Sequence, residues 1–219
     1  AIVGPTASGK TKLAIEICKK LNGEVVSADS IQIYKQMNIA SAKPSVSEMD
    51  EIAHHLIDIC DISCEFSVAD YVLLARKCIN KLHKANKLPV ICGGTGLYVD
   101  SLIKNINFSE CTSDENLRKR LLLKSQNEGS QSLVNELKKF DPYSAETIHP
   151  NNIKRLIRAI EIYRLTGITM TEHIKNSKNN ESEYSSCFIG LTFRNRDILY
   201  DRINKRVDLM FEQGLVDEA

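Results

Sequence analysis

The sequence predicts an α/β fold in which a parallel β-sheet is flanked by helices and carries an inserted all-helical domain. Three observations support this prediction. Short apolar runs alternate with amphipathic helical patterns over residues 1–108, helical patterns alone fill residues 109–186, and a further apolar run and helix follow in residues 187–219. Strands that alternate with helices indicate parallel pairing with helices on both faces of the sheet. We therefore expect a core domain of residues 1–108 and 187–219, with residues 109–186 as the inserted domain.

The first predicted strand runs directly into Gly-Pro-Thr-Ala-Ser-Gly-Lys-Thr, which is a P-loop, and an amphipathic helix follows as far as Leu21. Backbone N–H groups of such a loop surround a phosphate chain at a helix N-terminus, where the helix dipole favours negative charge. Lys10 supplies a positive charge, and the Thr11 hydroxyl can act as a ligand of Mg²⁺. The motif indicates a P-loop NTPase-like core. The expected phosphate-binding residues are Gly4, Pro5, Thr6, Ala7, Ser8, Gly9, Lys10 and Thr11.

Two further strands are predicted at residues 24–29 and 89–94, with a helix between them. Ser67 is expected to cap that helix, because Asp70 lies three residues later and apolar side chains then recur at helical spacing. In parallel sheets the ligand site lies beyond the carboxyl ends of the strands. Asp29 ends the first of these two strands, and a Gly-Gly-Thr-Gly run ends the second, so we expect both to converge with the P-loop on one crevice.

The inserted segment carries helix signals without intervening strands. Helices are expected over residues 114–128, 131–140 and 153–166, with a shorter one that begins at Asp141-Pro142. A polar connector over residues 175–186 then leads to a strand over residues 188–193 and a helix over residues 197–213.

The chain has 219 residues, 42% of them hydrophobic, and a net charge of only +1. This hydrophobic content can fill a core and argues against overall disorder, while the apolar runs are far shorter than a membrane span. The seven cysteines show no metal-ligand spacing, and no secretory leader is visible. We therefore expect a cytoplasmic protein with reduced, buried thiols and no membrane anchor. Because the sequence starts and stops within predicted elements, we also expect further residues beyond both ends.

Several segments after the P-loop appear in an order and spacing that resemble the tRNA dimethylallyltransferase family. In the first half these are Asp29-Ser30-Ile31-Gln32-Ile33-Tyr34, Ser41-Ala42-Lys43-Pro44, His54-His55-Leu56-Ile57-Asp58, Phe66-Ser67-Val68-Ala69-Asp70-Tyr71 and Gly93-Gly94-Thr95-Gly96-Leu97-Tyr98. In the second half they are His149-Pro150-Asn151-Asn152, the run from Arg155 to Glu161, and the run from Arg202 to Asp208. The resemblance covers essentially the whole chain.

The resemblance implies that the P-loop holds the diphosphate of dimethylallyl diphosphate together with Mg²⁺. The prenyl group would pass to the exocyclic amine of the adenosine that adjoins the anticodon of tRNA. The catalytic residues implied are Asp29 as general base, Thr11 as metal ligand and Arg202 on the diphosphate, with Arg206 as a weaker candidate for the last role. Asp29 could instead cap a helix or orient Mg²⁺, and Arg202 could be an ordinary surface arginine.

The implied partners are the tRNA anticodon stem-loop and dimethylallyl diphosphate, with no obligate protein partner and a monomeric state. Residues 150–206 carry eleven Lys and Arg against six Asp and Glu; RNA suits such a region, although a solvated helix face would show the same excess. The tRNA-contacting residues expected are Asp29, Ser30, Ile31, Gln32, Lys43, Thr95, Lys154, Arg155 and Arg158. Tyr98 could equally belong to the core. The adjacent His54 and His55 favour a structural or RNA-facing role over a metal site.

Three other functions remain open at this point. A P-loop kinase could transfer a phosphoryl group from ATP to a small metabolite, but it would leave the family segments unexplained. A prenyltransferase could act on a free adenine nucleotide, against which the basic helical insertion argues. An RNA-binding module could have lost turnover, against which Lys10, Thr11 and Asp29 argue.

Overall fold

The computed structural model describes residues 1–106, 113–177 and 182–219. It divides into two compact units, an α/β unit of residues 1–104 and 182–219 and a helical unit of residues 105–181. These boundaries lie a few residues from those expected at 108 and 187. Among the described residues, every helix is too short or too polar to span a bilayer.

The α/β unit is built on a five-stranded sheet in which every pairing is parallel, in the order β3-β2-β4-β1-β5. Its strands are β1 (Ile2–Val3), β2 (Gly23–Ser27), β3 (His54–His55), β4 (Leu88–Cys92) and β5 (Ile189–Gly190). Val25 of β2 lies opposite His54 on one side and Val90 on the other. The parallel sheet predicted from the alternating pattern is confirmed.

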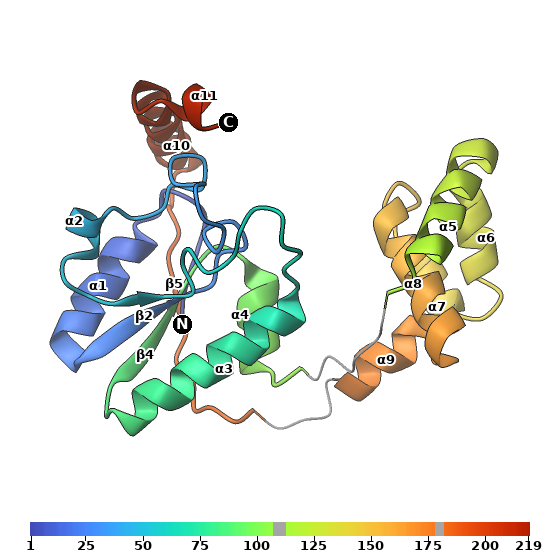
Figure 1. Cartoon of the computed structure of the whole chain (residues 1–219), viewed down its shortest axis with the longest axis horizontal. Coiled ribbons are helices and arrows are strands. Elements are labelled where there is room, and N and C mark those ends of the chain that lie inside the picture. Colours follow the sequence, from blue (N-terminus) through green and yellow to red (C-terminus); the bar gives the residue numbers. More distant parts are fainter. Residues whose placement is uncertain (107–112, 178–181) are drawn as a thin grey trace. The chain divides into compact units, whose positions relative to one another are not determined.

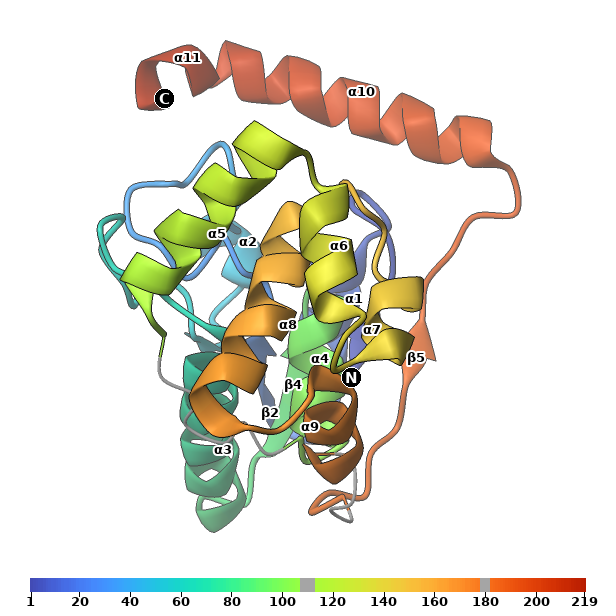
Figure 2. The same cartoon turned by 90° about the vertical axis from the view of Figure 1, so that its right-hand side faces the viewer.

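Helices cover both faces of this sheet (Figure 1). The covering helices are α1 (Lys10–Leu21) on one face and α3 (Val68–Lys84) and α4 (Gly96–Ile103) on the other, and the unit also contains α2 (Val46–Met49), α10 (Arg196–Glu212) and α11 (Leu215–Glu218). Because side chains alternate along a strand, Val25 and Val90 pack with Ala14 and Cys18 of α1, whereas α3 and α4 lie on the opposite face. Figure 2 shows α10 as a straight helix followed directly by α11 and the carboxyl end of the chain.

The predicted helix boundaries in this unit are confirmed where a local signal sets them. Ser67 caps α3 through a capping box with Asp70, as expected. Asn22 ends α1 in the left-handed conformation, with φ 49°.

Other elements differ from the prediction. The strand predicted over residues 188–193 forms only at Ile189–Gly190, because it pairs with β1, which is itself two residues long. Neither β3 nor α2 was predicted, since both are too short and polar to show a period. Helix α9 (Met170–Ser177) extends into the segment predicted as a connector, of which residues 178–181 lie outside the described residues.

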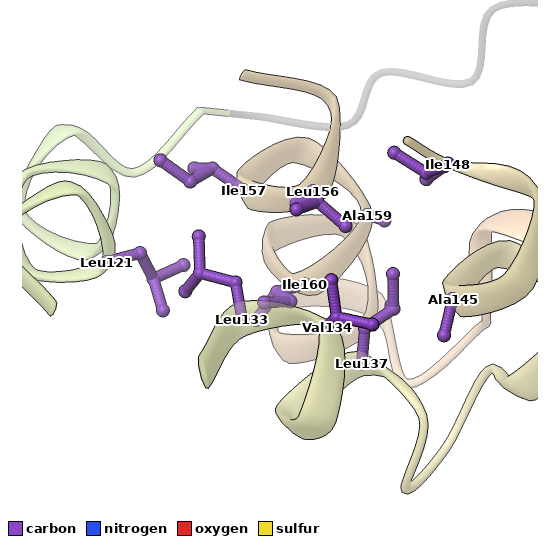
Figure 3. Packing of buried hydrophobic residues seen from close by; sticks show 10 residues of the cluster. All are labelled: Leu121, Leu133, Val134, Leu137, Ala145, Ile148, Leu156, Ile157, Ala159 and Ile160. Carbon is purple, nitrogen blue, oxygen red and sulfur yellow. The ribbon is translucent and has the colours of Figure 1, made fainter. Parts of the chain in front are cut away.

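In the part of the helical unit that the structure describes, the helices pack around one apolar cluster (Figure 3). Its helices are α5 (Glu115–Glu128), α6 (Gln131–Leu137), α7 (Pro142–Thr147), α8 (Ile153–Thr166) and α9. Helix α8 supplies Leu156, Ile157, Ala159 and Ile160 to the cluster, which is the face that its helical period predicts.

A buried carboxylate ties α8 to α5. Glu161 is fully buried and accepts hydrogen bonds from Arg118 Nε at 2.8 Å, from Arg158 Nη1 at 2.6 Å and from the Asp114 N–H at 2.9 Å. Burial acts to raise the pKa of Glu161, but the bonds from Arg118, Arg158 and Asp114 hold it below its ordinary value. The carboxylate is therefore charged and fully bonded inside the unit.

The cysteines are only partly buried. Cys18 and Cys92 lie in the core, where desolvation raises the pKa of each thiol to about 11. Cys64 and Cys187 are exposed, so the expectation of buried thiols is wrong for these two. Both lie in connecting segments outside the helices and strands, where no core is available to cover them.

Candidate active site

The P-loop connects β1 to α1 and wraps closely enough to require glycine. Gly4 has φ 154°, and a Cβ there would come within 2.5 Å of the Leu191 carbonyl oxygen. Gly9 caps α1 with φ 92°, a left-handed conformation that side chains oppose. The loop therefore delivers its N–H groups to the start of α1, where an anion is favoured.

Lys10 is bound within the loop that it follows. Its Nζ donates to the carbonyl oxygens of Gly4 at 3.0 Å and Pro5 at 2.8 Å. Desolvation lowers the pKa of Lys10, and the positive charge of Arg206 acts in the same direction, while the charge of Asp29 opposes the shift. Thr11 follows in the first turn of α1 and is exposed.

Two arginines of α10 reach the P-loop from the other end of the sequence. Arg202 Nε donates to the Ala7 carbonyl at 2.8 Å. Arg206 donates to Thr6 Oγ1 at 3.1 Å and to the Ala42 carbonyl at 3.3 Å. Arg202 also lies over the ring of Phe193, 5.6 Å from its centroid. Both arginines thus contact the P-loop, and the role of Arg202 on the diphosphate stays a prediction.

A cavity of about 1240 Å³ opens between the P-loop, the segment from Asn38 to Asp50, and α10. Its wall combines cations with apolar side chains. The apolar members include Ile15, Met49, Leu209 and Met210. The wall also contains carboxylates, among them Glu16 and Asp50, so the cavity combines charged groups of both signs with apolar surface.

Asp29 lies two residues after the end of β2, just past the strand rather than within it as predicted, and is held in a fixed orientation. Its Oδ1 accepts from the N–H of Ile31 at 2.9 Å and from that of Gln32 at 3.3 Å. Gly94 lies near the other carboxylate oxygen, because a Cβ there would come to 3.9 Å from Oδ2. Gly93 is needed for packing, since its Cβ would lie 2.2 Å from the Ala28 carbonyl oxygen. The Asx-type turn thus orients the carboxylate of Asp29.

The loops after β2 and β4 are joined by the Thr95 hydroxyl. It accepts from the Ser30 N–H at 2.9 Å and donates to Ser30 Oγ at 3.2 Å. The Thr95 N–H in turn donates to the Ala28 carbonyl at 3.0 Å. The two strand ends that the sequence predicts to converge do so through these bonds.

Lys43 points inward. Its side chain is 5% exposed, and its Nζ donates to the Tyr34 carbonyl at 2.9 Å, to Asn38 Oδ1 at 3.0 Å and to the Asp58 carboxylate. The structure therefore gives Lys43 a role in holding its own loop, and its contact with tRNA stays a prediction.

The remaining predicted positions fall in two places. Ile31 is partly exposed at 43% beside Asp29. Lys154 and Arg155 are exposed in the first turn of α8 in the helical unit, whereas Arg158 is bonded to Glu161. Tyr98 is buried and stacked on a neighbouring tyrosine, with the ring centroids 4.2 Å apart, so its assignment to the core is confirmed.

The two histidines of β3 make separate contacts. His54 Nδ1 bonds the Ile52 carbonyl at 2.8 Å, and His55 Nε2 bonds the carboxylate of Glu24. The rings thus serve different neighbours on the two faces of the strand.

The family model described as IPP transferase matches residues 32–219 of the sequence. The chain belongs to the IPP transferase family. It is 52% identical over 218 residues to a tRNA dimethylallyltransferase of Acetivibrio thermocellus, covering 100% of this chain and 69% of that protein. It is 50% identical over 219 residues to the corresponding protein of Halalkalibacterium halodurans, again with 100% and 69% covered.

Solved structures of this family share its fold. The crystal structure of a full-length tRNA isopentenylpyrophosphate transferase from Bacillus halodurans aligns with TM-score 0.67 and 48% identity, covering 99% of this chain and 67% of that one. A eukaryotic dimethylallyltransferase, solved acting on tRNA, aligns with TM-score 0.83 and 30% identity, covering 99% and 53%. The resemblance and the P-loop NTPase-like fold expected from the sequence are thereby confirmed.

Apart from Arg202 and Arg206, the sequence did not predict that residues on one face of α10 in this IPP transferase belong to the site. The cavity is also lined by Lys205, Leu209, Met210 and Gln213. These positions follow Arg202 at helical spacing, so the period of α10 counted from that arginine would have found them. Glu218 was also missed, because nothing local in the sequence shows its contact with residues 38–40.

Proposed function

We propose that this chain transfers a dimethylallyl group from dimethylallyl diphosphate to the exocyclic amine of the adenosine adjoining the anticodon in tRNA, releasing diphosphate. The observation that carries the proposal is the cavity where the P-loop meets the arginines of α10. Asp29 lies close enough to Lys10, which lines this cavity, for its negative charge to favour a higher pKa of Lys10. The names of the relatives, together with the eukaryotic neighbour solved acting on tRNA, support the choice of substrates.

The cations at this cavity suit a leaving diphosphate. Lys10, Arg202 and Arg206 are held by carbonyl and hydroxyl oxygens, and among the described residues none of the three is paired with a carboxylate. Their charges are therefore available to phosphate oxygens. Neutralising the charge that develops on diphosphate as it departs makes it a good leaving group.

The donor set at the start of α1 fits Mg²⁺ held mainly through its substrate. Among the described residues there is no cluster of three or more His, Cys, Asp or Glu side chains that could form an all-protein site. Mg²⁺ is commonly bound by few protein groups together with substrate phosphates. Thr11 would supply one hydroxyl oxygen, and the ion would add positive charge at the diphosphate.

Asp29 would act as the general base. The amine nitrogen of the adenine attacks the allylic carbon of the donor, the carbon–oxygen bond to diphosphate breaks, and diphosphate departs with the electron pair. The nitrogen thereby gains a positive charge and loses a proton to the Asp29 carboxylate. The bonds from Ile31 and Gln32 to Oδ1 keep this carboxylate in place.

Substrate tRNA would be held by residues of both units. Ser30, Ile31, Gln32 and Thr95 surround Asp29, and exposed Lys154 and Arg155 of the helical unit would bind RNA phosphates. The adenosine must leave its base stack to reach a site at a strand end. We place this reaction in the cytoplasm, performed by a monomer.

The test is prenyl transfer by the full-length protein with Mg²⁺, an anticodon stem-loop RNA and labelled dimethylallyl diphosphate, with γ-labelled ATP and free AMP tested in parallel. Label on the RNA adenosine from the prenyl donor alone is the expected result. Transfer from ATP alone would establish a kinase, and prenylation of AMP but not RNA would establish a nucleotide prenyltransferase.

The Asp29→Asn variant tests the catalytic assignment in the same assay. It should lower kcat by about 10²–10⁴-fold, because a general base contributes about that factor. The amide keeps an oxygen that can accept the bonds from Ile31 and Gln32. A variant with full transfer would remove Asp29 from the role of base. Lys20→Ala, at the far end of α1 from the P-loop, is the control and should transfer at the normal rate.

A further inference from the structure

Glu218, in α11, binds three consecutive backbone N–H groups far from it in the sequence. Its carboxylate accepts from the N–H of Asn38 at 2.6 Å, from that of Ile39 at 2.8 Å and from that of Ala40 at 2.7 Å. All four residues belong to the α/β unit. Asn38 and Ile39 also line the cavity beside the P-loop.

Consecutive N–H groups that point into one concavity form a nest that binds anions. Partial burial acts to raise the pKa of Glu218, but the bonds from Ala40, Ile39 and Asn38 lower it below its ordinary value. Glu218 is therefore ionised at neutral pH, and its hydrogen bonds are of the strong, charge-assisted kind.

The same loop is held from its other side by Lys43. The ammonium of Lys43 binds the Tyr34 carbonyl and Asn38 Oδ1, so Asn38 is engaged by a cation through its side chain and by an anion through its backbone. The loop over residues 38–43 is thus bound by Lys43, which lies in the loop, and by Glu218, which comes from α11. Arg206 of α10 also donates to its Ala42 carbonyl.

This loop in turn orients the residues around Asp29. The carbonyls of Ser41 and Ala42 both accept from Gln32 Nε2, each at 3.2 Å. The backbone N–H of Gln32 donates to Asp29 Oδ1. A continuous path of hydrogen bonds and covalent chain therefore leads from Glu218 to Asp29.

We propose that Glu218 is a positioning residue for the transfer reaction: its carboxylate fixes residues 38–42, and through them the side chain of Gln32 and the carboxylate of Asp29. The inference rests on the proposed function. It gives α11 a part in catalysis although α11 itself need not touch either substrate.

The experiment compares the full-length protein with its Glu218→Ala, Glu218→Gln and Asp217→Asn variants in the prenyl-transfer assay. Asp217 is the matched control, because it is an exposed acid on the same helical turn and is absent from the cavity wall. For Glu218→Ala we expect kcat to fall about tenfold and KM for dimethylallyl diphosphate to change less than about twofold, because its phosphate cradle is held by other bonds. The kcat of Glu218→Gln, which keeps one acceptor oxygen, should lie between that of the unaltered protein and that of Glu218→Ala.

Added formate provides the decisive measurement. Removal of the carboxylate leaves the nest of residues 38–40 without its anion, and formate can occupy it, so formate should restore transfer in Glu218→Ala and leave Asp217→Asn unchanged. Backbone amide exchange of residues 38–40 should be faster in Glu218→Ala and slow again with formate.

The outcomes separate the inference from the proposed function. Normal kcat in Glu218→Ala overturns the inference. Two other results also overturn the inference, in favour of a general structural role for Glu218. One is a Glu218→Ala enzyme that is slow and that formate does not restore. The other is a Glu218→Ala enzyme with a lowered Tm and proportionate losses of activity toward both substrates. Absence of transfer by the unaltered protein overturns the proposed function, and the inference with it.

Discussion

The cations at the P-loop and those around Glu161 of the helical unit are held in different ways. Lys10 and Arg202 donate to backbone carbonyls, whereas Arg118 and Arg158 donate to the buried carboxylate of Glu161. A cation held by a carbonyl keeps its net charge, while a cation held by a carboxylate is neutralised. We therefore expect the same type of residue to bind a ligand in one region and to stabilise packing in the other.

Among the variants that test this comparison, Lys10→Ala should have the largest effect, because it removes a cation of the P-loop. Loss of a preorganised positive group at a developing negative charge costs about 10²–10³-fold in kcat. The free energy of unfolding should change little, because the hydrogen bonds of the Lys10 ammonium go to its own loop. Prenyl transfer and urea denaturation, measured side by side with Lys20→Ala as control, check this. A large loss of stability with a normal kcat would reverse the assignment.

Glu161→Gln tests the other half, and the expected effect is on stability. Removing the charge that both arginines share should lower the free energy of unfolding of the helical unit by about 2 kcal/mol, a moderate value because the arginines are partly exposed. Hydrogen exchange of α5 and α8 in the full-length protein measures the loss. Glu146→Gln, at an exposed position of α7, is the control and should leave exchange unchanged.

The same carboxylate gives the helical unit an acid-sensitive stability. Because the pKa of Glu161 is lower in the folded state, its contribution is fully present above the unfolded value of about 4.3 and is lost as the pH falls through the folded value. Exchange in α5 and α8 should therefore rise below about pH 4.3, and the rise should be smaller in Glu161→Gln. An identical acid response in the variant would contradict the assignment.

The smallest effect should come from the Lys154→Ala, Arg155→Ala double variant, which sharpens the comparison within the helical unit. These exposed cations are the ones predicted to bind RNA phosphates, so KM for tRNA should rise by roughly tenfold and the slope of log affinity against log salt should fall by about 1–2. KM for dimethylallyl diphosphate should not change. An unaltered salt slope would assign both side chains to the solvated surface.

The elements that the sequence predicted well are those with a local cause. The capping box at Ser67 and the left-handed Asn22 set helix ends by contacts within a few residues. Strand β3 was not predicted and β5 is shorter than predicted, because both form only where a longer or buried neighbour supplies the hydrogen bonds. Their existence depends on tertiary pairing.

The candidate site divides in the same way. The P-loop follows from its motif, and Asp29 from its place at a strand end, whereas the roles of Lys43 and Glu218 depend on contacts that join distant segments. The resemblance predicts that Lys43 contacts tRNA, and the structure adds that its side chain is turned into its own loop. Sequence gives the charge of a side chain, and the fold decides what that charge faces.

The sheet order has a consequence for how the chain acquires its structure. β1 lies between β4 and β5, so both neighbours of the strand that leads into the P-loop follow it in the sequence, and β5 follows the whole helical unit. The N–H groups of Ile189 and Leu191 close this pairing on Ala1 and Val3. During synthesis, one edge of β1 must wait for its partner until the helical unit has left the ribosome, and an open strand edge is where folding chains aggregate. Nascent chains that stop before β5 should therefore be the ones that need a chaperone.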